Sequence, residues 1–193
     1  AFSLADRAAL VTGSSQGIGF AIASALREAG ARVVFHGLPA RADGIPDDTP
    51  YVSADLMQPD GPARLVTAAF GAAPQLDTLI CNAGSFFDVP FLEMTRERWE
   101  KTVALNITAT YFVAQEFAKR LVAGKRGGCI VITTSTNGLQ AETDSTAYDT
   151  SKGALVMLTR SLAVSLADRG IRENDNAPGL IRTPLTSTWL EPR

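Results

Sequence analysis

The sequence predicts an α/β fold in which a doubly wound parallel sheet carries helices on both faces. Short apolar runs alternate along the chain with longer segments whose apolar residues recur at helical spacing. The short runs are almost continuously apolar, which is typical of parallel strands that are buried on both faces. A length of 193 residues suits one domain with a sizeable core. We therefore expect residues 1–193 to form a single domain.

The expected elements follow one another in a strict alternation. Strands are expected over residues 8–13, 32–37, 51–56, 76–84 and 127–135, and helices over residues 18–30, 62–72, 95–124 and 148–170. Gly30 and Gly124 supply helix stops, and Pro62 stands at a helix start. The segment 38–50 is rich in proline and aspartate and is expected to be a loop.

Composition and charge exclude several classes of function. With 18 basic and 20 acidic residues the formal net charge is −2, which predicts neither a nucleic-acid nor a membrane partner. No apolar run approaches the roughly 20 residues of a membrane span, and the first residues do not resemble a signal peptide. Cys81 and Cys129 lie in apolar runs and are expected to be reduced thiols, and His36 is the sole histidine. We expect a cytoplasmic protein without a metal site.

A glycine-rich turn, "TGSSQGIG" (12–19), lies between the first strand and the first helix. Gly13 permits a tight turn, Gly17 lets a pyrophosphate approach the backbone, and Gly19 allows the helix to pack closely on the strand. The helix N-terminus adds free N–H groups and a positive dipole end. The turn predicts a Rossmann-like, dinucleotide-binding domain; the alternative is a tight turn without a ligand.

Further motifs follow in a fixed order: "CNAG" (81–84), Asn106 in "VALNITATYFVAQ", Ser135 at the end of "CIVITTS", "YDTSK" (148–152) and "APGLIRTP" (177–184). Together with the glycine turn, they resemble the short-chain dehydrogenase/reductase family from about residue 8 to about residue 185. The resemblance implies an NAD(P)-dependent oxidoreductase that interconverts a secondary alcohol and a ketone. It also implies a small-molecule substrate and a homo-oligomer, either tetramer or dimer.

The predicted catalytic residues are Asn106, Ser135, Tyr148 and Lys152. Tyr148 and Lys152 are four residues apart and share one helix face. A free phenol has a pKa of about 10, and a nearby ammonium is expected to lower it toward the working pH, so that Tyr148 acts as general acid–base. The resemblance implies that Lys152 also binds the nicotinamide ribose, Ser135 the substrate oxygen, and Asn106 a water in a proton relay. The alternatives are a packed tyrosine beside a snorkelling lysine, a turn serine and a buried structural amide.

The resemblance also assigns the cofactor contacts. They are Gly13, Ser15, Gln16, Gly17, Ile18, Gly19, Gly37, Asp55, Leu56, Asn82, Ala83, Gly84, Tyr148, Lys152, Pro178, Gly179, Ile181 and Thr183. Asp55 is expected at the adenine, with a capping role as the alternative.

The choice between NAD and NADP depends on the end of the second strand. Gly37 stands where NAD-preferring members carry an acidic residue, and Gln16 replaces a common basic residue of the turn. Arg41 or His36 could bind a 2′-phosphate instead, although a histidine at a strand end is more often simply solvated. The sequence therefore favours NADP without excluding NAD.

The chain departs from the family at two places. In "GIRENDNAPG" (170–179), Glu173, Asp175 and Asn176 stand where the family has an apolar strand, and burying unpaired carboxylates there is costly. We hypothesise that these three residues are misassigned, which peptide mass spectrometry of the expressed protein would test. The sequence ends at Arg193, before the family's seventh strand and last helix, so we expect a chain truncated at its C-terminal end.

The substrate pocket is expected from residues 85–91, residues 136–146 and the segment after Pro184. Phe86, Phe87 and Phe91 suggest an apolar wall, whereas Gln140, Glu142 and Asp144 suggest contacts with hydroxyls. A polyol, a sugar acid, a 3-oxoacyl thioester and a steroid all stay open as substrates. The alternative function is a catalytically silent NAD(P)-binding sensor or scaffold, which would not need a poised phenol.

Overall fold

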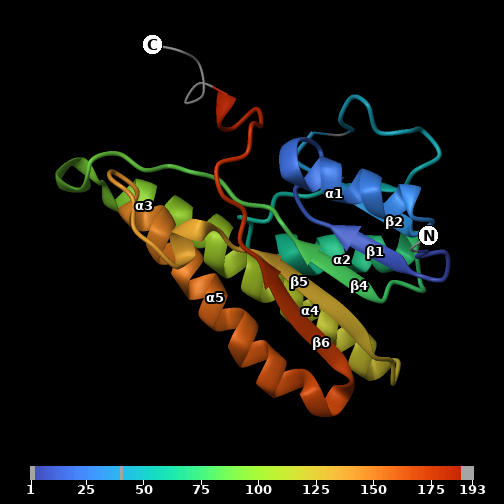
Figure 1. The fold of residues 1–193 in the computed structure, drawn as a ribbon. Coiled ribbons are helices and arrows are strands. Elements are labelled where there is room, and N and C mark those ends of the chain that lie inside the picture. Colours follow the sequence, from blue (N-terminus) through green and yellow to red (C-terminus); the bar gives the residue numbers. More distant parts are fainter. Residues whose placement is uncertain (1–2, 40, 188–193) are drawn as a thin grey trace.

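A single parallel sheet organises the protein, as seen in a computed structural model that describes residues 3–39 and 41–187. Its strands run in the order β3-β2-β1-β4-β5-β6 (Figure 1). They are β1 (Ala8–Val11), β2 (Arg32–Gly37), β3 (Tyr51–Ser53), β4 (Thr78–Cys81), β5 (Gly128–Thr133) and β6 (Ile171–Asn176). The strand order reverses between β1 and β4, and ligands bind beside the carboxyl ends of the strands at such a point.

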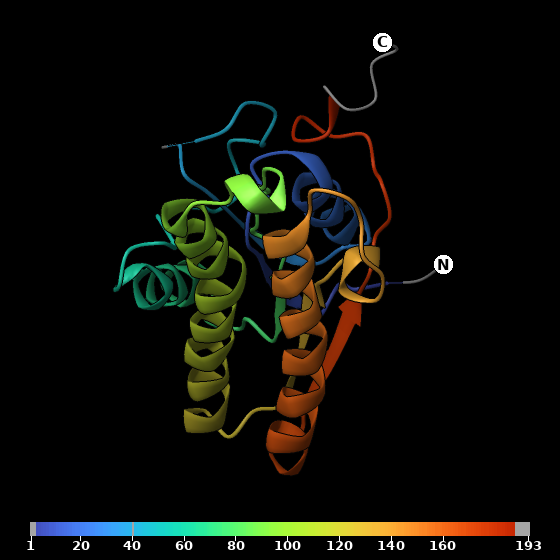
Figure 2. The same ribbon diagram turned by 90° about the vertical axis from the view of Figure 1, so that its left-hand side faces the viewer.

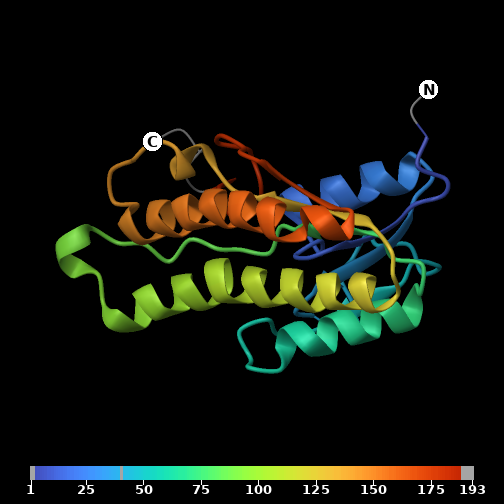
Figure 3. The ribbon, with the colours of Figure 1, turned by 90° about the horizontal axis from the view of Figure 1, so that it is seen from below.

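Helices cover both faces of this sheet, as predicted. They are α1 (Gly17–Glu28), α2 (Gly61–Ala72), α3 (Arg96–Thr102), α4 (Thr110–Ala123) and α5 (Thr146–Leu166). Figures 2 and 3 show α4 and α5 side by side, with α2 next to α4. Short 3₁₀ turns occupy Phe91–Glu93, Thr136–Gly138 and Ala167–Arg169, and a π-helical turn, Val103–Ala109, joins α3 to α4.

Two apolar cores lie on the two faces of the sheet. Leu10, Leu79 and Ile130 point toward α2, α4 and α5, where they join Phe117 and Leu155. Their strand neighbours, such as Val11 and Ile80, point the other way and pack with α1. Because successive strand residues face opposite sides and both sides are covered, the strands read as continuous apolar runs.

The predicted strands and helices are confirmed in type and order, but several bounds differ: the strands predicted over 51–56, 76–84 and 127–135 are shorter, and the helix predicted over 148–170 spans Thr146–Leu166. The first strand stops at Val11 rather than residue 13, because the next residues leave the ladder to begin the glycine turn. The helix predicted over 95–124 is divided by the π-helical turn, which contains Asn106. The described residues of segment 38–50 form neither helix nor strand, as predicted.

The sixth strand forms despite its polar residues and pairs with β5 from Ile171 to Asn176. Asp175 and Asn176 accept hydrogen bonds from the hydroxyls of Thr134 (3.3 Å) and Thr133 (3.2 Å). Glu173 is buried, and neither carboxylate oxygen has a hydrogen-bond partner among the described residues. Burial raises the pKa of Glu173 to about 8. An energetic cost of burial without hydrogen-bond partners was predicted for Glu173, Asp175 and Asn176. In the structure it applies to Glu173, because the other two side chains have partners.

Cys81 and Cys129 are both free thiols. Within residues 3–39 and 41–187, no helix is long and apolar enough to cross a membrane.

Candidate active site

A cleft of about 1060 Å³ opens at the carboxyl edge of the sheet. The glycine turn, the ends of β2, β4 and β5, the start of α5 and the segment after β6 line it. Every predicted catalytic or cofactor-binding residue lines this cleft except Gly19 and Asn106. The residues that line it are Gly13, Ser15, Gln16, Gly17, Ile18, Gly37, Asp55, Leu56, Asn82, Ala83, Gly84, Ser135, Tyr148, Lys152, Pro178, Gly179, Ile181 and Thr183.

The glycine turn has no room for side chains at its two ends. Gly13 has φ +63°, and a Cβ there would lie 2.8 Å from the Cα of Ala83. At Gly19 a Cβ would lie 2.4 Å from the Asn82 side-chain nitrogen. The tight turn predicted at Gly13 and the close packing predicted at Gly19 are therefore both present.

The N-terminus of α1 opens into the same cleft and fits a pyrophosphate. Its N-cap residue, Gln16, makes no side-chain capping bond, and no acidic residue lies in the first turn. Its first N–H groups therefore keep the positive end of the helix dipole without a competing carboxylate. Thr12 fastens the turn to the end of β4, because its Oγ1 accepts from the N–H groups of Asn82 (2.9 Å) and Ala83 (3.0 Å). The residues present thus suit a dinucleotide.

Lys152 is buried beside Tyr148 on α5, with 5% of its surface exposed. Its Nζ donates to the Thr133 carbonyl at 2.9 Å and lies 5.4 Å from the centre of the Tyr148 ring. Burial lowers the pKa of Lys152 to about 8. The pair predicted from spacing is therefore assembled at the end of β5.

The expected effect of Lys152 on Tyr148 is not what the structure shows. The pKa of Tyr148 is raised, chiefly because burial disfavours the phenolate, while a hydrogen bond with Ser135 lowers it and the carboxylates of Asp149 and Glu142 raise it. The prediction that this pKa is lowered toward the working pH is wrong for the protein alone. The ammonium is bonded to the Thr133 carbonyl and lies against the ring, so it does not offset the burial.

Ser135 lies two residues after the end of β5 and is buried next to the phenol. Its Oγ also accepts from the N–H of Asn137 at 3.1 Å and caps the following 3₁₀ turn. The Ser135 hydroxyl therefore lies beside the Tyr148 phenol, as expected for a site residue, and also caps a turn, as the alternative proposed.

Asn106 lies in the π-helical turn and is fully buried. Its Nδ2 donates to the carbonyl of Ser85 and the hydroxyl of Ser151, and its Oδ1 accepts from the N–H of Ser85, each at 3.0 Å. Ser151 in turn donates to the Tyr148 carbonyl at 2.7 Å. The amide thus joins the chain after β4 to the catalytic helix. Its role in a water relay stays a prediction.

Asp88 is a site residue that the sequence analysis missed. Its two carboxylate oxygens accept from the N–H groups of Ala147 (2.8 Å) and Tyr148 (3.1 Å). They cap α5, whose own N-cap residue, Ser145, makes no side-chain capping bond. The ring of Phe86, from the same loop, lies 5.4 Å from that of Tyr148. The one signal in the sequence was a lone acid within the apolar stretch "SFFDVPF" (85–91).

The expected substrate wall is only partly present. Phe86, Glu142 and Asp144 line the cleft, whereas Phe87, Phe91 and Gln140 do not. Phe91 is 68% exposed in the 3₁₀ turn Phe91–Glu93 and does not line the cleft, so that part of the prediction is wrong.

Asp149 anchors the loop that carries Glu142. Its carboxylate accepts from the Asn137 amide (2.7 Å), the Ser145 hydroxyl (2.6 Å) and the Glu142 N–H (3.0 Å). The loop over the substrate side is therefore tied to the first turn of α5.

The corner at Gly37 cannot hold an acidic side chain. A Cβ at Gly37 would lie 2.5 Å from the Tyr51 hydroxyl oxygen and 2.7 Å from the Ser15 Cβ. Tyr51 and Ser15 therefore fill the space that an acidic side chain at this position would need.

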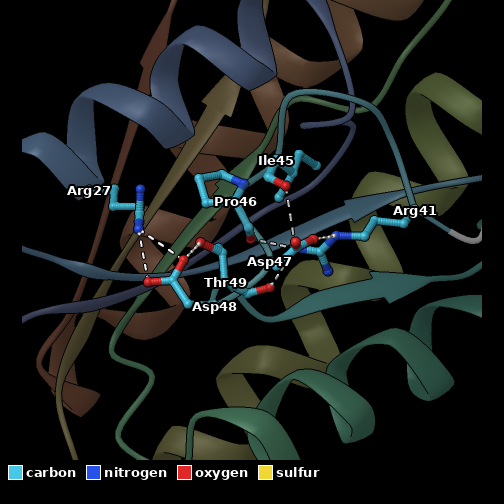
Figure 4. Close-up of polar contacts among 7 residues, drawn as sticks. All are labelled: Arg27, Arg41, Ile45, Pro46, Asp47, Asp48 and Thr49. Atoms are coloured by element: carbon cyan, nitrogen blue, oxygen red, sulfur yellow. Dashed lines mark hydrogen bonds and ion pairs between the residues drawn. The ribbon is translucent and has the colours of Figure 1, made fainter.

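The two candidate partners for a 2′-phosphate are engaged elsewhere. His36 lines the cleft but is only 3% exposed, so the prediction that it is solvated is wrong, and both of its ring nitrogens are bonded to backbone groups. The Arg41 guanidinium donates to the carbonyls of Ile45 (3.5 Å), Pro46 and Thr49 (3.3 Å) (Figure 4). Arg41 thus stabilises the loop after β2 by these hydrogen bonds, and it does not line the cleft.

Asp55 lines the cleft and closes a local turn. Its carboxylate accepts from the Met57 N–H (2.9 Å) and the Gln58 side chain (3.0 Å), and these bonds lower its pKa. Asp55 therefore closes a turn and does not cap a helix, because the N-cap residue of α2 is Asp60. Its contact with the adenine stays a prediction.

Over the part of the chain that the structure describes, no group of histidine, cysteine, aspartate and glutamate side chains could hold a metal ion.

Comparisons with known proteins agree with this geometry. The sequence model of the short chain dehydrogenase family matches residues 7–193. Glucose 1-dehydrogenase of Gluconobacter oxydans is 33% identical over 97% of this chain and 74% of its own length. L-rhamnose 1-dehydrogenase (NAD(P)(+)) of Azotobacter vinelandii is 36% identical over 97% of this chain and 78% of its own length.

Solved structures share the fold. A short-chain type dehydrogenase/reductase from Mycobacterium marinum superposes with a TM-score of 0.90 at 32% identity, over 97% of this chain and 78% of the other. A structure described as an NAD(P)-dependent gluconate 5-dehydrogenase from Beutenbergia cavernae, with NADP bound at low occupancy, gives a TM-score of 0.87. It is 32% identical over the same shares of the two chains.

Proposed function

Because the chain belongs to the short-chain dehydrogenase/reductase family and is an NAD(P)-dependent oxidoreductase, we propose that it interconverts a secondary alcohol and a ketone with Tyr148 as general acid–base. The observation that carries the proposal is the single cleft that holds both the glycine turn and the group formed by the half-buried Tyr148 with the buried Lys152 and Ser135. A protein that only sensed nucleotides would have no use for a phenol placed beside a buried ammonium and a buried serine.

Each residue has a definite task in this proposal. The Tyr148 phenol exchanges a proton with the substrate oxygen, and Ser135 hydrogen-bonds the same oxygen and the phenol. Lys152 keeps a positive charge beside the phenol, where it favours the phenolate while Tyr148 is deprotonated. The nicotinamide, when bound, supplies or accepts the hydride.

We propose NADP as the preferred cofactor. The support is the Gly37 corner, where no carboxylate can repel a 2′-phosphate because Tyr51 and Ser15 fill the space. Neither His36 nor Arg41 adds to that support. Titrating the protein with NADPH and NADH side by side tests the choice, and tighter binding of NADH would refute it.

We propose a polyhydroxylated carbonyl compound or its alcohol as substrate. Four polar residues from the segment between β5 and the start of α5 line the cleft: Asn137, Glu142, Asp144 and Ser145. L-xylulose reductase of Bos taurus, 35% identical over 98% of this chain and 78% of its own length, acts on a substrate of this class by its name. A panel of neutral sugars and polyols, assayed with both nucleotides, is the first screen.

We also propose a cytoplasmic homo-oligomer, either tetramer or dimer. Tyr111 and Phe112 on α4 and Met157 and Val164 on α5 leave large apolar side chains exposed on adjacent helices. Two free thiols suit a reducing compartment. Light scattering coupled to gel filtration tests the assembly, and a monomer at micromolar concentration would contradict it.

The decisive experiment replaces Tyr148 with Phe. This change removes one hydroxyl and keeps the ring that packs on Phe86. We expect turnover to fall by about 10²–10⁴-fold, the usual contribution of a positioned acid–base, while nucleotide binding persists. Turnover that survived would refute the role of Tyr148. Tyr111→Phe, an exposed tyrosine on α4, is the matched control and should leave turnover unchanged.

A further inference from the structure

His36, the sole histidine of the chain, bridges two separate parts of the cofactor cleft. Its Nδ1 lies 3.0 Å from the backbone nitrogen of Gly13, and its Nε2 lies 3.1 Å from the carbonyl oxygen of Ala54. The main chain is fixed as well: the His36 N–H donates to the Ser14 Oγ (2.9 Å), and the Ser14 N–H donates to the His36 carbonyl (2.8 Å). No other side chain joins the glycine turn to the segment after β3 in the described residues.

The two ring contacts define one protonation state. The Gly13 N–H can only donate, so Nδ1 must carry a lone pair, and the Ala54 carbonyl can only accept, so Nε2 must carry the hydrogen. An imidazolium would set two N–H groups against each other at Gly13. Burial acts in the same direction, because it lowers the pKa of His36.

The two segments that the His36 ring joins lie at opposite ends of the part of the cleft that is expected to bind the adenosine half of the cofactor. Gly13 begins the turn that offers backbone N–H groups to a pyrophosphate, and Ala54 directly precedes Asp55 and Leu56 at the expected adenine edge. We propose that His36 is a positioning residue: its neutral ring holds the glycine turn and the 54–56 segment at the spacing that a dinucleotide needs, and its protonation releases them. The inference rests on the proposed function, since it concerns the same cofactor.

The charged and titratable groups around the ring are few. The glycine turn and β1 contribute none. β3 contributes Tyr51, and the segment after it contributes Asp55, whose carboxylate is held by Met57 and Gln58. At the start of α2, Asp60 and Arg64 pair with each other at the surface (3.7 Å). No ion pair to the ring is present among the described residues.

The sign of the pH dependence follows from the required state. A histidine whose folded pKa is lowered contributes stability that is present above its ordinary value of 6.5 and is lost as the pH falls below it. Dinucleotide affinity should therefore be full above neutral pH and fall on acidification. By reciprocity, a dinucleotide that needs the neutral ring makes that ring harder to protonate.

Nuclear magnetic resonance of ¹⁵N-histidine-labelled protein tests the inference directly, because one residue gives all the ring signals. We expect the neutral Nε2–H tautomer at pH 7, and we expect saturating NADPH to weaken proton binding to the ring by about threefold or more. An Nδ1–H tautomer, an imidazolium at pH 7, or an unchanged titration with NADPH bound would overturn the proposal.

Two variants separate positioning from simple structural damage. In His36→Asn the amide oxygen can still accept from Gly13 but does not titrate between pH 5.5 and 8, whereas His36→Ala loses both bonds. We expect the NADPH dissociation constant of the wild type to rise at least threefold from pH 8 to pH 5.5, and that of His36→Asn to change much less. His36→Ala should bind about tenfold more weakly at every pH.

The control is Asp55→Asn, which removes the nearest carboxylate and should keep the acid-induced loss of affinity. If Asp55→Asn abolished that loss and His36→Asn kept it, the proposal would be wrong. Failure of the wild type to bind either NADPH or NADH would instead refute the proposed function, and the tautomer measurement would still report on the bridge. Should His36→Ala fail to fold, the wild type and His36→Asn suffice.

Discussion

The carboxyl edge of the sheet and the interior of β6 bury polar side chains with opposite results. At the edge, His36 and Asn106 have hydrogen-bond partners for their ring and amide groups. On β6, Glu173 is buried with both oxygens unpartnered among the described residues. Backbone groups that leave the ladder at strand ends are free to bond side chains, whereas inside a ladder the neighbouring strands already use them. The carboxyl ends of the strands therefore supply partners for buried polar side chains, whereas the middle of β6, which pairs with β5, supplies none for Glu173 among the described residues.

The largest expected effect comes from removing the cation at the edge by Lys152→Met. We expect turnover on the substrate found by screening to fall about 10²-fold or more, because the phenolate loses its charge partner. Because the folded pKa of Lys152 is about 8, below its ordinary 10.5, the wild type loses stability as the pH falls from about 10.5 toward 8. Melting curves between pH 7 and 10 should show that this slope is absent from the variant.

Lys101→Met is the matched control, since Lys101 is exposed and pairs only with Glu97 on its own helix (2.8 Å). It should leave turnover and the pH slope unchanged. Turnover of Lys152→Met within tenfold of the wild type would show that the edge does not need the buried charge.

On β6, by contrast, Glu173→Val is expected to stabilise the protein. Replacing an unpartnered buried carboxyl with an apolar side chain should raise the free energy of unfolding by about 1–3 kcal/mol. The folded pKa of Glu173 is about 8, above its ordinary 4.5, so the wild type loses stability as the pH rises through that range. Urea unfolding at pH 5, 7 and 9 should show a gain that grows with pH.

Asp175→Asn controls for charge on the same strand, because its carboxylate has the Thr134 hydroxyl as a partner. If Glu173→Val left the free energy of unfolding unchanged, or lowered it, at all three pH values, β6 would accommodate the carboxylate without a loss of stability. Peptide mass spectrometry of the same preparation tests the separate hypothesis that Glu173, Asp175 and Asn176 are misassigned; finding Glu173 and Asp175 would refute it.

The sequence predicted the parts of this comparison that depend on neighbours along the chain. Strand and helix periodicity, the glycine turn and the Tyr148–Lys152 spacing are all local, and each was found in place. The roles of His36 and Asp88 depend on partners 18 to 60 residues away, which no local pattern contains. The raised pKa of Tyr148 was missed for the same reason, because burial is a property of the assembled site.

Asp88→Asn is expected to have the smallest effect, and it tests whether the cap on α5 positions Tyr148. A carboxylate accepts from two backbone N–H groups at once, whereas an asparagine offers one oxygen and turns its NH₂ toward the other N–H. Loss of half a helix cap costs about 1 kcal/mol. We expect a turnover three- to tenfold lower with the dissociation constant of NADPH unchanged, since Asp88 holds Tyr148 and not the glycine turn.

Glu93→Gln is the matched control, an exposed acid that does not line the cleft. If Asp88→Asn and Glu93→Gln reduced turnover equally, the loss would not come from the cap. If only Asp88→Asn reduced it, the position of Tyr148 would depend on a residue 60 positions away along the chain. In that case the residues that hydrogen-bond buried groups at the carboxyl ends of the strands would also orient the side chain that exchanges the proton.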